Sequence, residues 1–302
     1  MKQFFNFAVF FILLWIVLPV YADYKESLQA CTQLWKLENI EEINYFSVLN
    51  NFVAKAYSAK YNSLVVIKIG DVASESEILQ MFDEQGLVKL LDYNETDQAM
   101  LLEYIPEKVK LFDVLRSAQN DDYLIDVFIT SFKKIHKNQL PYNFKTTKLQ
   151  SIFDLIQKFK TYNSILIPQR LLDKAIYISN QLTASAKDVY LLHGDLHCDN
   201  IIVTEHDCIA IDPRGIIGEL ECEATSFLIS PIYCLVEIVD LRKLILHRID
   251  RLSFELNFDR QRLQDWLFIK VIEAACFFEK ENSRHDLVNT WIEFACMLET
   301  IK

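Results

Sequence analysis

Short apolar runs separated by turn residues fill the chain from about residue 45 to Pro106. Runs of this kind, alternating in polarity and rich in β-branched residues, are typical of β-strands. The pattern predicts five strands with one helix among them. The predicted strands are Tyr45–Lys60 (two strands turning at Asn50-Asn51), Leu64–Ile69, Gly86–Tyr93 and Gln98–Tyr104, and the predicted helix is Ser74–Glu84.

From residue 112 onward, apolar residues recur at three- and four-residue spacing, which indicates helices. The stretch Tyr190–Gly215 interrupts this pattern and reads as strand, turn and strand. We therefore expect an α+β chain in two domains: a small antiparallel sheet with one helix over residues 23–104, and a larger, mainly helical domain over residues 105–302. The predicted helices are Phe112–Arg116, Asp121–Lys137, Lys148–Thr161, Gln169–Ala184, Ser230–Leu256, Arg260–Lys280 and Arg284–Ile301.

Composition narrows the class of protein. The 302 residues are 51% apolar with a formal net charge of −11, which excludes a disordered chain and argues against a basic nucleic-acid-binding surface. An acidic surface is compatible with a small cationic substrate, and it equally serves solubility. The seven cysteines contain no C-x-x-C pair, so they indicate buried thiols in a reducing compartment such as the cytoplasm.

Residues 1–22 point in another direction. Lys2 is followed by the apolar run Phe4–Leu18, and the segment ends in Tyr21-Ala22, which resembles a signal-peptide cleavage site. The other interpretation is that the true start of the protein lies downstream. Localisation therefore stays open between export or membrane anchoring through residues 1–22 and the cytoplasm that the cysteines indicate.

The segment Tyr190–Gly215 carries the candidate chemistry. Asp195 follows His193 by two residues and Asn200 follows Asp195 by five, the offsets of the kinase catalytic loop H-R-D-x-x-x-x-N. Asp212 ends the next strand, where protein kinases carry the aspartate of D-F-G. A hydroxyl nucleophile needs a carboxylate to accept its proton, which we expect of Asp195. Asn200 and Asp212 offer the oxygen ligands that Mg²⁺ prefers, and Mg²⁺ would accompany ATP.

Two other interpretations of this segment stay open. A polar loop capped by aspartate and asparagine would look the same. His193 and His197, four residues apart, would bind zinc if they lay on one face of a helix, but the β-branched run Ile201–Val203 that follows directly disfavours a helix.

A single lysine, Lys68, interrupts the apolar strand Leu64–Ile69. A buried lysine is costly unless its charge is paired, so Lys68 is either an edge residue that reaches solvent or the lysine that contacts the ATP phosphates in the V-A-I-K strand of kinases. We favour the second interpretation, with Glu77 of the next helix as the partner and Glu75 as the competing one. Glu77 also fits a capping box with Ser74, in which case it would only cap the helix.

Two motifs carry a family resemblance: H-G-D-L-H-C-D-N over His193–Asn200 and A-I-D-P-R-G-I-I-G-E over Ala210–Glu219. The chain resembles the aminoglycoside phosphotransferase superfamily, in particular its branch of streptomycin 6-phosphotransferases and hydroxyurea-resistance kinases. The resemblance implies a two-lobed protein-kinase-like fold, with ATP and Mg²⁺ as cofactors. It also implies Asp195 as the catalytic base, Lys68 on the ATP phosphates, and His193 as a brace of the catalytic loop.

The same resemblance extends to the ends of the first domain. Glu103–Glu107 would be the hinge between the lobes, with backbone groups of Glu103 and Tyr104 bound to an adenine edge. The turn over the phosphates would lie at Ser47–Val53, which contains no glycine. Asn51 starts Asn51-Phe52-Val53 where the family has Asn-Tyr-Val, so we expect Asn51 near the nucleotide.

A further departure lies after the I-G-E sequence, where the branch has proline and aspartate and this chain has Leu220 and Glu223. The acids of Glu219–Glu223 would either meet a cationic substrate or simply favour the start of a helix through its dipole.

The leading hypothesis is an ATP-dependent phosphotransferase that acts on a hydroxyl of a small molecule, an aminoglycoside-type antibiotic. One alternative is a metabolic kinase of the same fold, acting on choline, a sugar amine or homoserine. The other is an exported binding protein without catalysis, suggested by residues 1–22 and the glycine-free turn. In none of these do we expect a nucleic-acid partner, and membrane contact would involve residues 1–22 alone.

Overall fold

Two compact units make up the chain: one extends to Pro106 and the second begins at Glu107. The computed structural model describes residues 24–43, 51–82, 85–109, 111–116, 121–137, 149–186, 188–230, 240–281 and 285–301. The signal-like segment 1–22 and most of the predicted phosphate turn lie outside these residues. Within the described part of the chain, no helix combines the length and apolar character needed to span a membrane.

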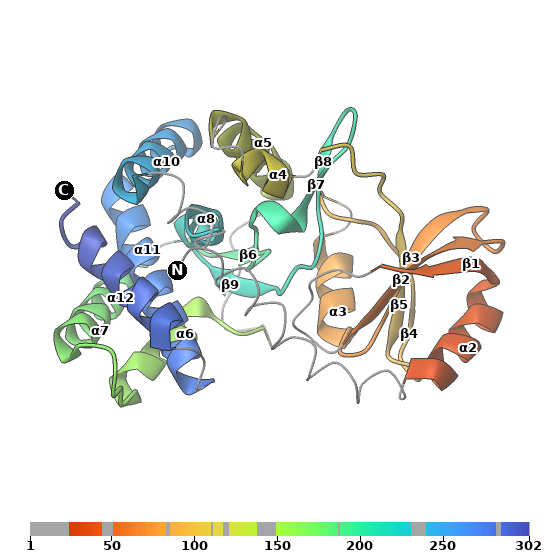
Figure 1. Ribbon diagram of the computed structural model, residues 1–302, viewed down its shortest axis with the longest axis horizontal. Helices are drawn as coiled ribbons and strands as arrows, with labels where there is room; N and C mark the ends of the chain where they lie inside the picture. Colours follow the sequence, from red (N-terminus) through yellow and green to blue (C-terminus); the bar gives the residue numbers. More distant parts are fainter. Residues whose placement is uncertain are drawn as a thin grey trace, which may run out of the picture. The chain divides into compact units, whose positions relative to one another are not determined.

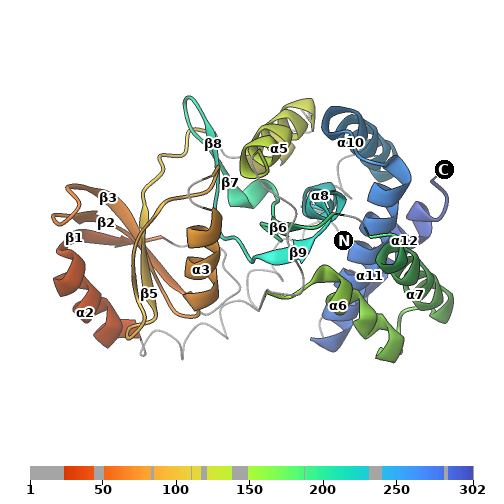
Figure 2. The same cartoon turned by 180° about the vertical axis from the view of Figure 1, so that it is seen from behind.

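The first unit contains a five-stranded antiparallel sheet in the order β1-β2-β3-β5-β4. Helices α2 and α3 lie on opposite sides of this sheet (Figures 1 and 2). Tight turns join β2 to β3 and β4 to β5, and Asn62 and Gln98 in these turns take the left-handed backbone conformation, with φ of 52° and 45°. The elements are α2 Tyr24–Trp35, β1 Leu37–Glu42, β2 Phe52–Ser58, β3 Ser63–Ile69, α3 Ala73–Phe82, β4 Leu90–Asn94 and β5 Ala99–Glu103.

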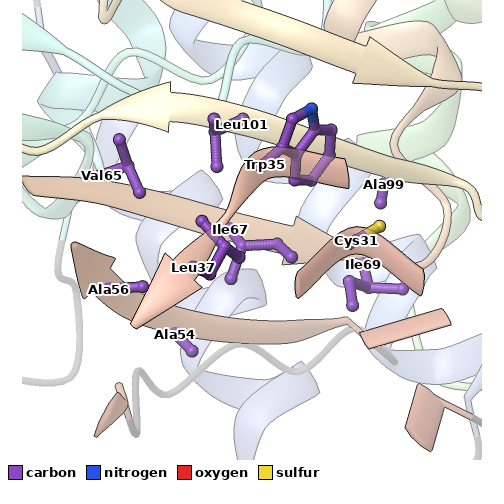
Figure 3. Close-up of a cluster of buried hydrophobic side chains, with 10 residues drawn as sticks. All are labelled: Cys31, Trp35, Leu37, Ala54, Ala56, Val65, Ile67, Ile69, Ala99 and Leu101. Atoms are coloured by element: carbon purple, nitrogen blue, oxygen red, sulfur yellow. The ribbon is translucent and has the colours of Figure 1, made fainter. Parts of the chain in front are cut away.

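The core of the first unit lies between α2 and one face of the sheet. Because side chains alternate along a strand, every second residue of β2 and β3 points to this face. Trp35 of α2 is fully buried, and its indole N–H donates to Asp92 Oδ2 at 3.0 Å. Removal of a buried tryptophan side chain costs about 3–5 kcal/mol, so Trp35 is a main anchor of α2. The cluster shown in Figure 3 consists of Cys31, Trp35, Leu37, Ala54, Ala56, Val65, Ile67, Ile69, Ala99 and Leu101.

Strand β1 is a strand that the sequence pattern did not predict. It occupies Leu37–Glu42, directly after α2, whereas the first strand was expected from Tyr45 onward. All its residues except Leu37 are exposed, and its pairing with β2 is irregular between Glu38 and Glu41. An exposed edge strand needs little apolar character, because backbone pairing with its neighbour holds it, so the pattern gives no sign of it.

Helices dominate the second unit. The long helix α11 is its central element and packs against α7, α8, α10 and α12 (Figures 1 and 2). Asp240 and Asp259 cap the starts of α10 and α11 by accepting the amides of Lys243 and Arg262. The helices are α4 Leu111–Arg116, α5 Asp121–Ile135, α6 Ile152–Ile156, α7 Gln169–Ala184, α8 Leu220–Leu228, α10 Leu241–Leu256, α11 Arg260–Lys280 and α12 His285–Leu298.

The clearest difference from the predicted helices lies in residues 148–161. In place of a helix over Lys148–Thr161, α6 begins at Ile152 and gives way at Gln157 to a 3₁₀ helix. The side chain of Ser151 accepts the amide of Phe153 and so starts α6. Of the predicted helix Ser230–Leu256, the structure describes α10, which begins at Leu241 after the cap Asp240; residues 231–239 lie outside the described part.

Two small sheets support the segment with the candidate chemistry. Strand β6 (Tyr190–Leu192) pairs with β9 (Ile216–Gly218), and β7 (Ile201–Val203) forms a hairpin with β8 (Cys208–Ala210). A short 3₁₀ turn, Cys198–Asn200, precedes β7. The predicted site residues of this unit therefore lie on just two connections, the one from β6 to β7 and the one from β8 to β9.

Helix α8 follows β9 and is fixed from its far end by Arg248 of α10. The Arg248 side chain is fully buried and donates to the carbonyls of Phe227 (3.1 Å) and Ser230 (3.3 Å) and to Asp121 Oδ1 (2.6 Å). The last carbonyls of a helix have no partner within it, so a buried guanidinium at this place both satisfies them and holds α8 against α5 and α10.

Candidate active site

Lys68 lies on the face of the sheet opposite to α2. Its neighbours Ile67 and Ile69 belong to the α2 core, so the alternation of β3 turns Lys68 toward the side of α3. There its Nζ lies 2.6 Å from Glu75 Oε2, and the two side chains are only 10% and 11% exposed. This buried ion pair excludes the interpretation of Lys68 as a solvent-reaching edge residue.

The partner of Lys68 is thus Glu75, and the expectation that Glu77 would fill this role is wrong. Glu75 lies three and four residues before Ile78 and Leu79, which are buried, so helical spacing places it on the inner face of α3. Glu77 is exposed. The spacing to the buried residues is a signal in the sequence that would have identified Glu75.

The other first-unit residues predicted to contact the nucleotide already take part in local contacts. The Oδ1 of Asn51 accepts the amide of Asp71 at 3.0 Å, which ties the start of β2 to the turn after β3. The amides of Glu103 and Tyr104 donate to carbonyls of Lys89 and of β3 at 3.0 and 3.3 Å. Any contact of this segment with an adenine edge would therefore use other backbone groups than these two amides.

In the second unit, His193 begins the candidate catalytic loop and is fully buried. Its Nε2 lies 2.9 Å from the carbonyl of Ile211, and its Nδ1 accepts the amide of Asp195 at 3.3 Å. The pair of contacts fits the neutral ring with its proton on Nε2. Burial lowers the pKa of His193, which favours the same neutral form. Both nitrogens are in use, so the ring braces the loop and offers no atom to a zinc ion shared with His197.

A buried carboxylate of α8 anchors the start of this loop. Glu223 Oε2 accepts the amide of His193 at 2.6 Å, and Oε1 accepts the amide of Gly194 at 3.0 Å. Hydrogen bonds to an ionised group are roughly twice as strong as neutral ones, so Glu223 is a firm anchor. His136 of the segment after α5 lies 3.6 Å from the same carboxylate. The sequence identified Glu223 only as a departure from the family pattern and gave no sign of this role.

Glu219, at the start of the same segment, is also used inside the protein. Its carboxylate binds the Arg262 guanidinium at 2.6 and 2.7 Å and accepts the indole N–H of Trp266 at 2.9 Å. Glu219 and Glu223 are both buried. The interpretation as a solvated helix start therefore describes neither residue, and both carboxylates are bound by other groups of the protein.

Asp195 presents a partly exposed carboxylate at the centre of the loop. Arg214 Nη2 lies 3.0 Å from Oδ2, and His197 Nε2 lies 3.9 Å from Oδ1. The side-chain nitrogen of Asn200 donates to the main-chain carbonyl of Asp195 at 2.9 Å, which links the two predicted site residues. No described residue donates a hydrogen bond to Asn200 Oδ1, so this oxygen is available to a ligand.

Asp212 has a backbone φ of 58°, in the left-handed region that aspartate enters only at some cost. Strain of this kind persists where the surroundings fix it, commonly at functional sites. The surroundings here are hydrogen bonds to the catalytic loop: the amide of Ile211 donates to the Asn200 carbonyl at 2.9 Å, and the amides of Arg214 and Gly215 donate to the His193 carbonyl at 2.8 and 3.1 Å. The connection from β8 to β9 is thus bound to the connection from β6 to β7.

The donor set suits an ion that arrives with a nucleotide. Among the described residues, no group of three or more histidine, cysteine, aspartate or glutamate side chains could hold a metal by itself. Mg²⁺ in kinases is held by one or two protein oxygens together with phosphate oxygens. The available Oδ1 of Asn200 and the carboxylate of Asp212 fit that type of site, in which the protein provides only part of the shell.

A pocket of about 210 Å³ opens beside the catalytic loop within the second unit. It is smaller than the roughly 300–1,000 Å³ of pockets that enclose a whole drug-sized ligand, so it would hold one ring or a comparable group. Its polar wall contains Gln150, Arg214, Cys222, Glu223, Thr225, Ser226, Lys270 and Glu273.

The chain is similar in sequence to known kinases. A family model described as aminoglycoside/hydroxyurea antibiotic resistance kinase matches residues 62–282. The chain is 24% identical over 199 residues to streptomycin 6-kinase of Streptomyces griseus, a match that covers 65% of this chain and 63% of the relative. The chain thus spans somewhat less than two thirds of that relative's length.

Solved structures of low sequence identity share the fold. An ethanolamine kinase of Plasmodium vivax aligns with a TM-score of 0.62 at 15% identity, over 86% of this chain and 81% of that one. The aminoglycoside phosphotransferase APH(4)-Ia aligns with a TM-score of 0.65 at 9% identity, over 91% of this chain and 98% of that one. The expected α+β, protein-kinase-like fold is therefore confirmed.

Proposed function

Because the chain belongs to the aminoglycoside/hydroxyurea antibiotic resistance kinase family, we propose that it transfers the γ-phosphate of ATP to a hydroxyl group of a small molecule. The observation that carries the proposal is the catalytic loop: a partly exposed Asp195 lies between a buried His193 brace and an Asn200 whose amide oxygen is available. An arrangement of this kind suits proton acceptance next to a bound metal.

In this proposal, Asp195 accepts the proton of the acceptor hydroxyl as its oxygen attacks phosphorus. His193 and Glu223 do not react; they fix the backbone from which Asp195 projects. A carboxylate held in this way supplies general-base catalysis worth about 10²–10⁴ in rate, and its fixed position adds the advantage of orientation.

Each unit, taken by itself, offers groups that would serve the nucleotide. Lys68, kept in place by Glu75, would contact the ATP phosphates, and Asn51 would lie near them. Asn200 and Asp212 would hold Mg²⁺, whose chemistry is to neutralise charge on the phosphates. A solved structure of APH(4)-Ia contains ADP and hygromycin B, which supports a nucleotide and a small-molecule acceptor for this fold.

For the acceptor, we propose an aminoglycoside-type antibiotic, as the names of the relatives suggest. The pocket beside the catalytic loop would receive the ring that carries the reacting hydroxyl. Of the acids that the sequence offered for a cationic substrate, Glu219 and Glu223 are bound to other groups of the protein. Glu273 of the pocket wall lies 3.5 Å from Lys270 and would contact an acceptor amine in competition with that lysine.

The test is transfer of labelled γ-phosphate from ATP, with Mg²⁺, to a panel of aminoglycosides, amino alcohols and neutral sugars. We expect Asp195→Asn to lower turnover of the accepted substrate by about 10²–10⁴-fold. Asp173→Asn, an exposed aspartate of α7, is the matched control and should leave turnover unchanged. Equal turnover in the wild type and Asp195→Asn would refute the assigned base, and absence of transfer to every acceptor would refute the proposed function.

A further inference from the structure

The candidate base Asp195 does not stand alone, because Arg214 lies against it. Arg214 Nη2 is 3.0 Å from Asp195 Oδ2, while the arginine side chain is 64% exposed and that of Asp195 is 19% exposed. Arg214 comes two residues after Asp212 in the connection from β8 to β9. Neither the kinase offsets nor the family motif gives this arginine a function.

The stem of Arg214 is fixed although its guanidinium is exposed. The amide of Arg214 donates to the His193 carbonyl at 2.8 Å. Gly194, with φ of +82°, lies so near that a Cβ built on it would be 3.4 Å from the Arg214 Cβ and 3.3 Å from Ile216. The turn that contains Arg214 therefore packs directly on the turn that contains Asp195, which brings the stem of Arg214 close to the carboxylate.

The exposure of the pair argues against a role in stability. An ion pair between side chains that reach solvent contributes little to folding, because water screens it and two long side chains lose freedom. Since the pair contributes little to stability, the position of Arg214 beside the candidate base indicates a role in the reaction instead.

The two carboxylate oxygens have different surroundings. Oδ2 is occupied by Arg214, whereas Oδ1 has His197 Nε2 at 3.9 Å, beyond hydrogen-bond distance. His197 Nδ1 accepts the amide of Asp199 at 3.2 Å, which turns the ring's other nitrogen toward Asp195. Asn200 holds the main chain of Asp195 from the other side. Oδ1 is thus the oxygen left to receive a proton.

We propose that Arg214 is a positioning residue for catalysis: it binds Oδ2 of Asp195 and so directs Oδ1 toward the acceptor hydroxyl. This role rests on the proposed function. In the step, the hydroxyl proton moves to Oδ1, the bond from the acceptor oxygen to the γ-phosphorus forms, and the bond from that phosphorus to the bridging oxygen of ADP breaks. Arg214 takes no part in these bond changes.

The experiment compares Arg214→Ala and Arg214→Lys with the wild type in steady-state phosphoryl transfer. We expect Arg214→Ala to lower kcat on the order of 10- to 100-fold through misplacement of the base, with KM for ATP within about twofold. A single contact at 3.0 Å can be made by an ammonium, so Arg214→Lys should recover most of kcat. The melting temperature of both variants should match the wild type. Arg260→Ala removes a half-buried arginine that is paired with Asp250 outside the catalytic loop, and serves as the control.

The decisive measurement is a double-mutant cycle with Asp195→Asn. If Arg214 acts through Asp195, Arg214→Ala should change the residual rate of Asp195→Asn by less than about twofold. An equal loss in both backgrounds would mean that Arg214 contacts the phosphate or the acceptor directly and would overturn the proposal, as would an unchanged kcat in Arg214→Ala. A wild type that transfers no phosphate would refute the proposed function and this role with it, whereas an active wild type with an insensitive Arg214 refutes this role alone.

Discussion

The two units fix their candidate functional side chains in different ways. In the first unit, Lys68 is paired with the carboxylate of Glu75, which lies 2.6 Å away on the neighbouring helix. In the second, Asp195 is held through its backbone: carboxylate, imidazole and amide groups all bind the main chain around it. The first arrangement orients one charge by another charge, whereas the second fixes the backbone of a loop and adds the contact of Arg214 to the side chain.

The difference has a consequence for mutation. When one partner of a buried ion pair is removed, the other charge stays buried without a counter-charge, and this destabilises the folded state. A loop held by several hydrogen bonds loses only a part of its support with each substitution. The first unit should therefore be the more sensitive to a single change, and the second the more tolerant.

The largest effect is expected for Glu75→Gln. It removes the charge beside the buried ammonium of Lys68, and breaking a buried pair in this way costs about 3 kcal/mol or more. The measurement is the free energy of unfolding by urea, with hydrogen exchange in β3 and α3 to locate the loss. Glu77→Gln changes an exposed residue of the same helix and should stay within about 0.5 kcal/mol of the wild type. Equal losses in the two variants would restore Glu77 as a partner of Lys68.

A smaller loss is expected for Glu223→Gln in the second unit. The amide group can accept one of the two main-chain N–H groups but presents its own N–H to the other, and a hydrogen bond to a charged group contributes about 1.5–3 kcal/mol. We expect about 2 kcal/mol less stability and about tenfold slower turnover. Glu293→Gln, an exposed change on α12, is the control. A Glu223→Gln variant with wild-type turnover would show that the loop keeps its geometry without this anchor.

A third change tests the packing of the two turns against each other. Gly194→Ala places a side chain at φ of +82°, beside Ile216 and Arg214 at 3.3 and 3.4 Å. The left-handed conformation alone costs about 1–2 kcal/mol for a residue with a Cβ. We expect a loss of that size, measured by thermal unfolding, together with reduced turnover. Wild-type stability in this variant would mean that the connection from β8 to β9 moves aside freely.

The smallest effect is a dependence of stability on pH. Burial lowers the pKa of His193 in the folded protein, so below the unfolded-state pKa of about 6.5 the unfolded chain binds more protons at this site. Stability from this group is therefore complete above about pH 6.5 and falls as the pH drops toward the lowered folded value. Unfolding free energies measured from pH 7.5 to 5 should fall more steeply for the wild type than for His193→Asn. Parallel curves would contradict a buried, neutral His193.

Much of the candidate site follows from local sequence. The offsets among His193, Asp195 and Asn200 predicted a catalytic loop, and the structure places these residues on one connection, bound to the connection that contains Asp212. Lys68 was recognisable as an isolated charge in an apolar strand. Its burial in an ion pair agrees with the prediction that its charge would be paired. In each case the signal is the residue type at a fixed spacing in one continuous segment.

The sequence by itself determined the fold class, the order of most elements and the residues that carry polar groups into the catalytic loop, because periodicity and short motifs are properties of neighbouring residues. Only the tertiary structure decided that Lys68 pairs with Glu75, that Glu223 binds the loop amides from thirty residues away, and that Arg214 reaches Asp195. The presence of strand β1 was also decided by the tertiary structure, because its backbone pairs with β2 while all its side chains except Leu37 are exposed. Such contacts depend on which faces meet when the chain folds, and a carboxylate or guanidinium has the same appearance in a sequence whether it lies in solvent or against a buried amide.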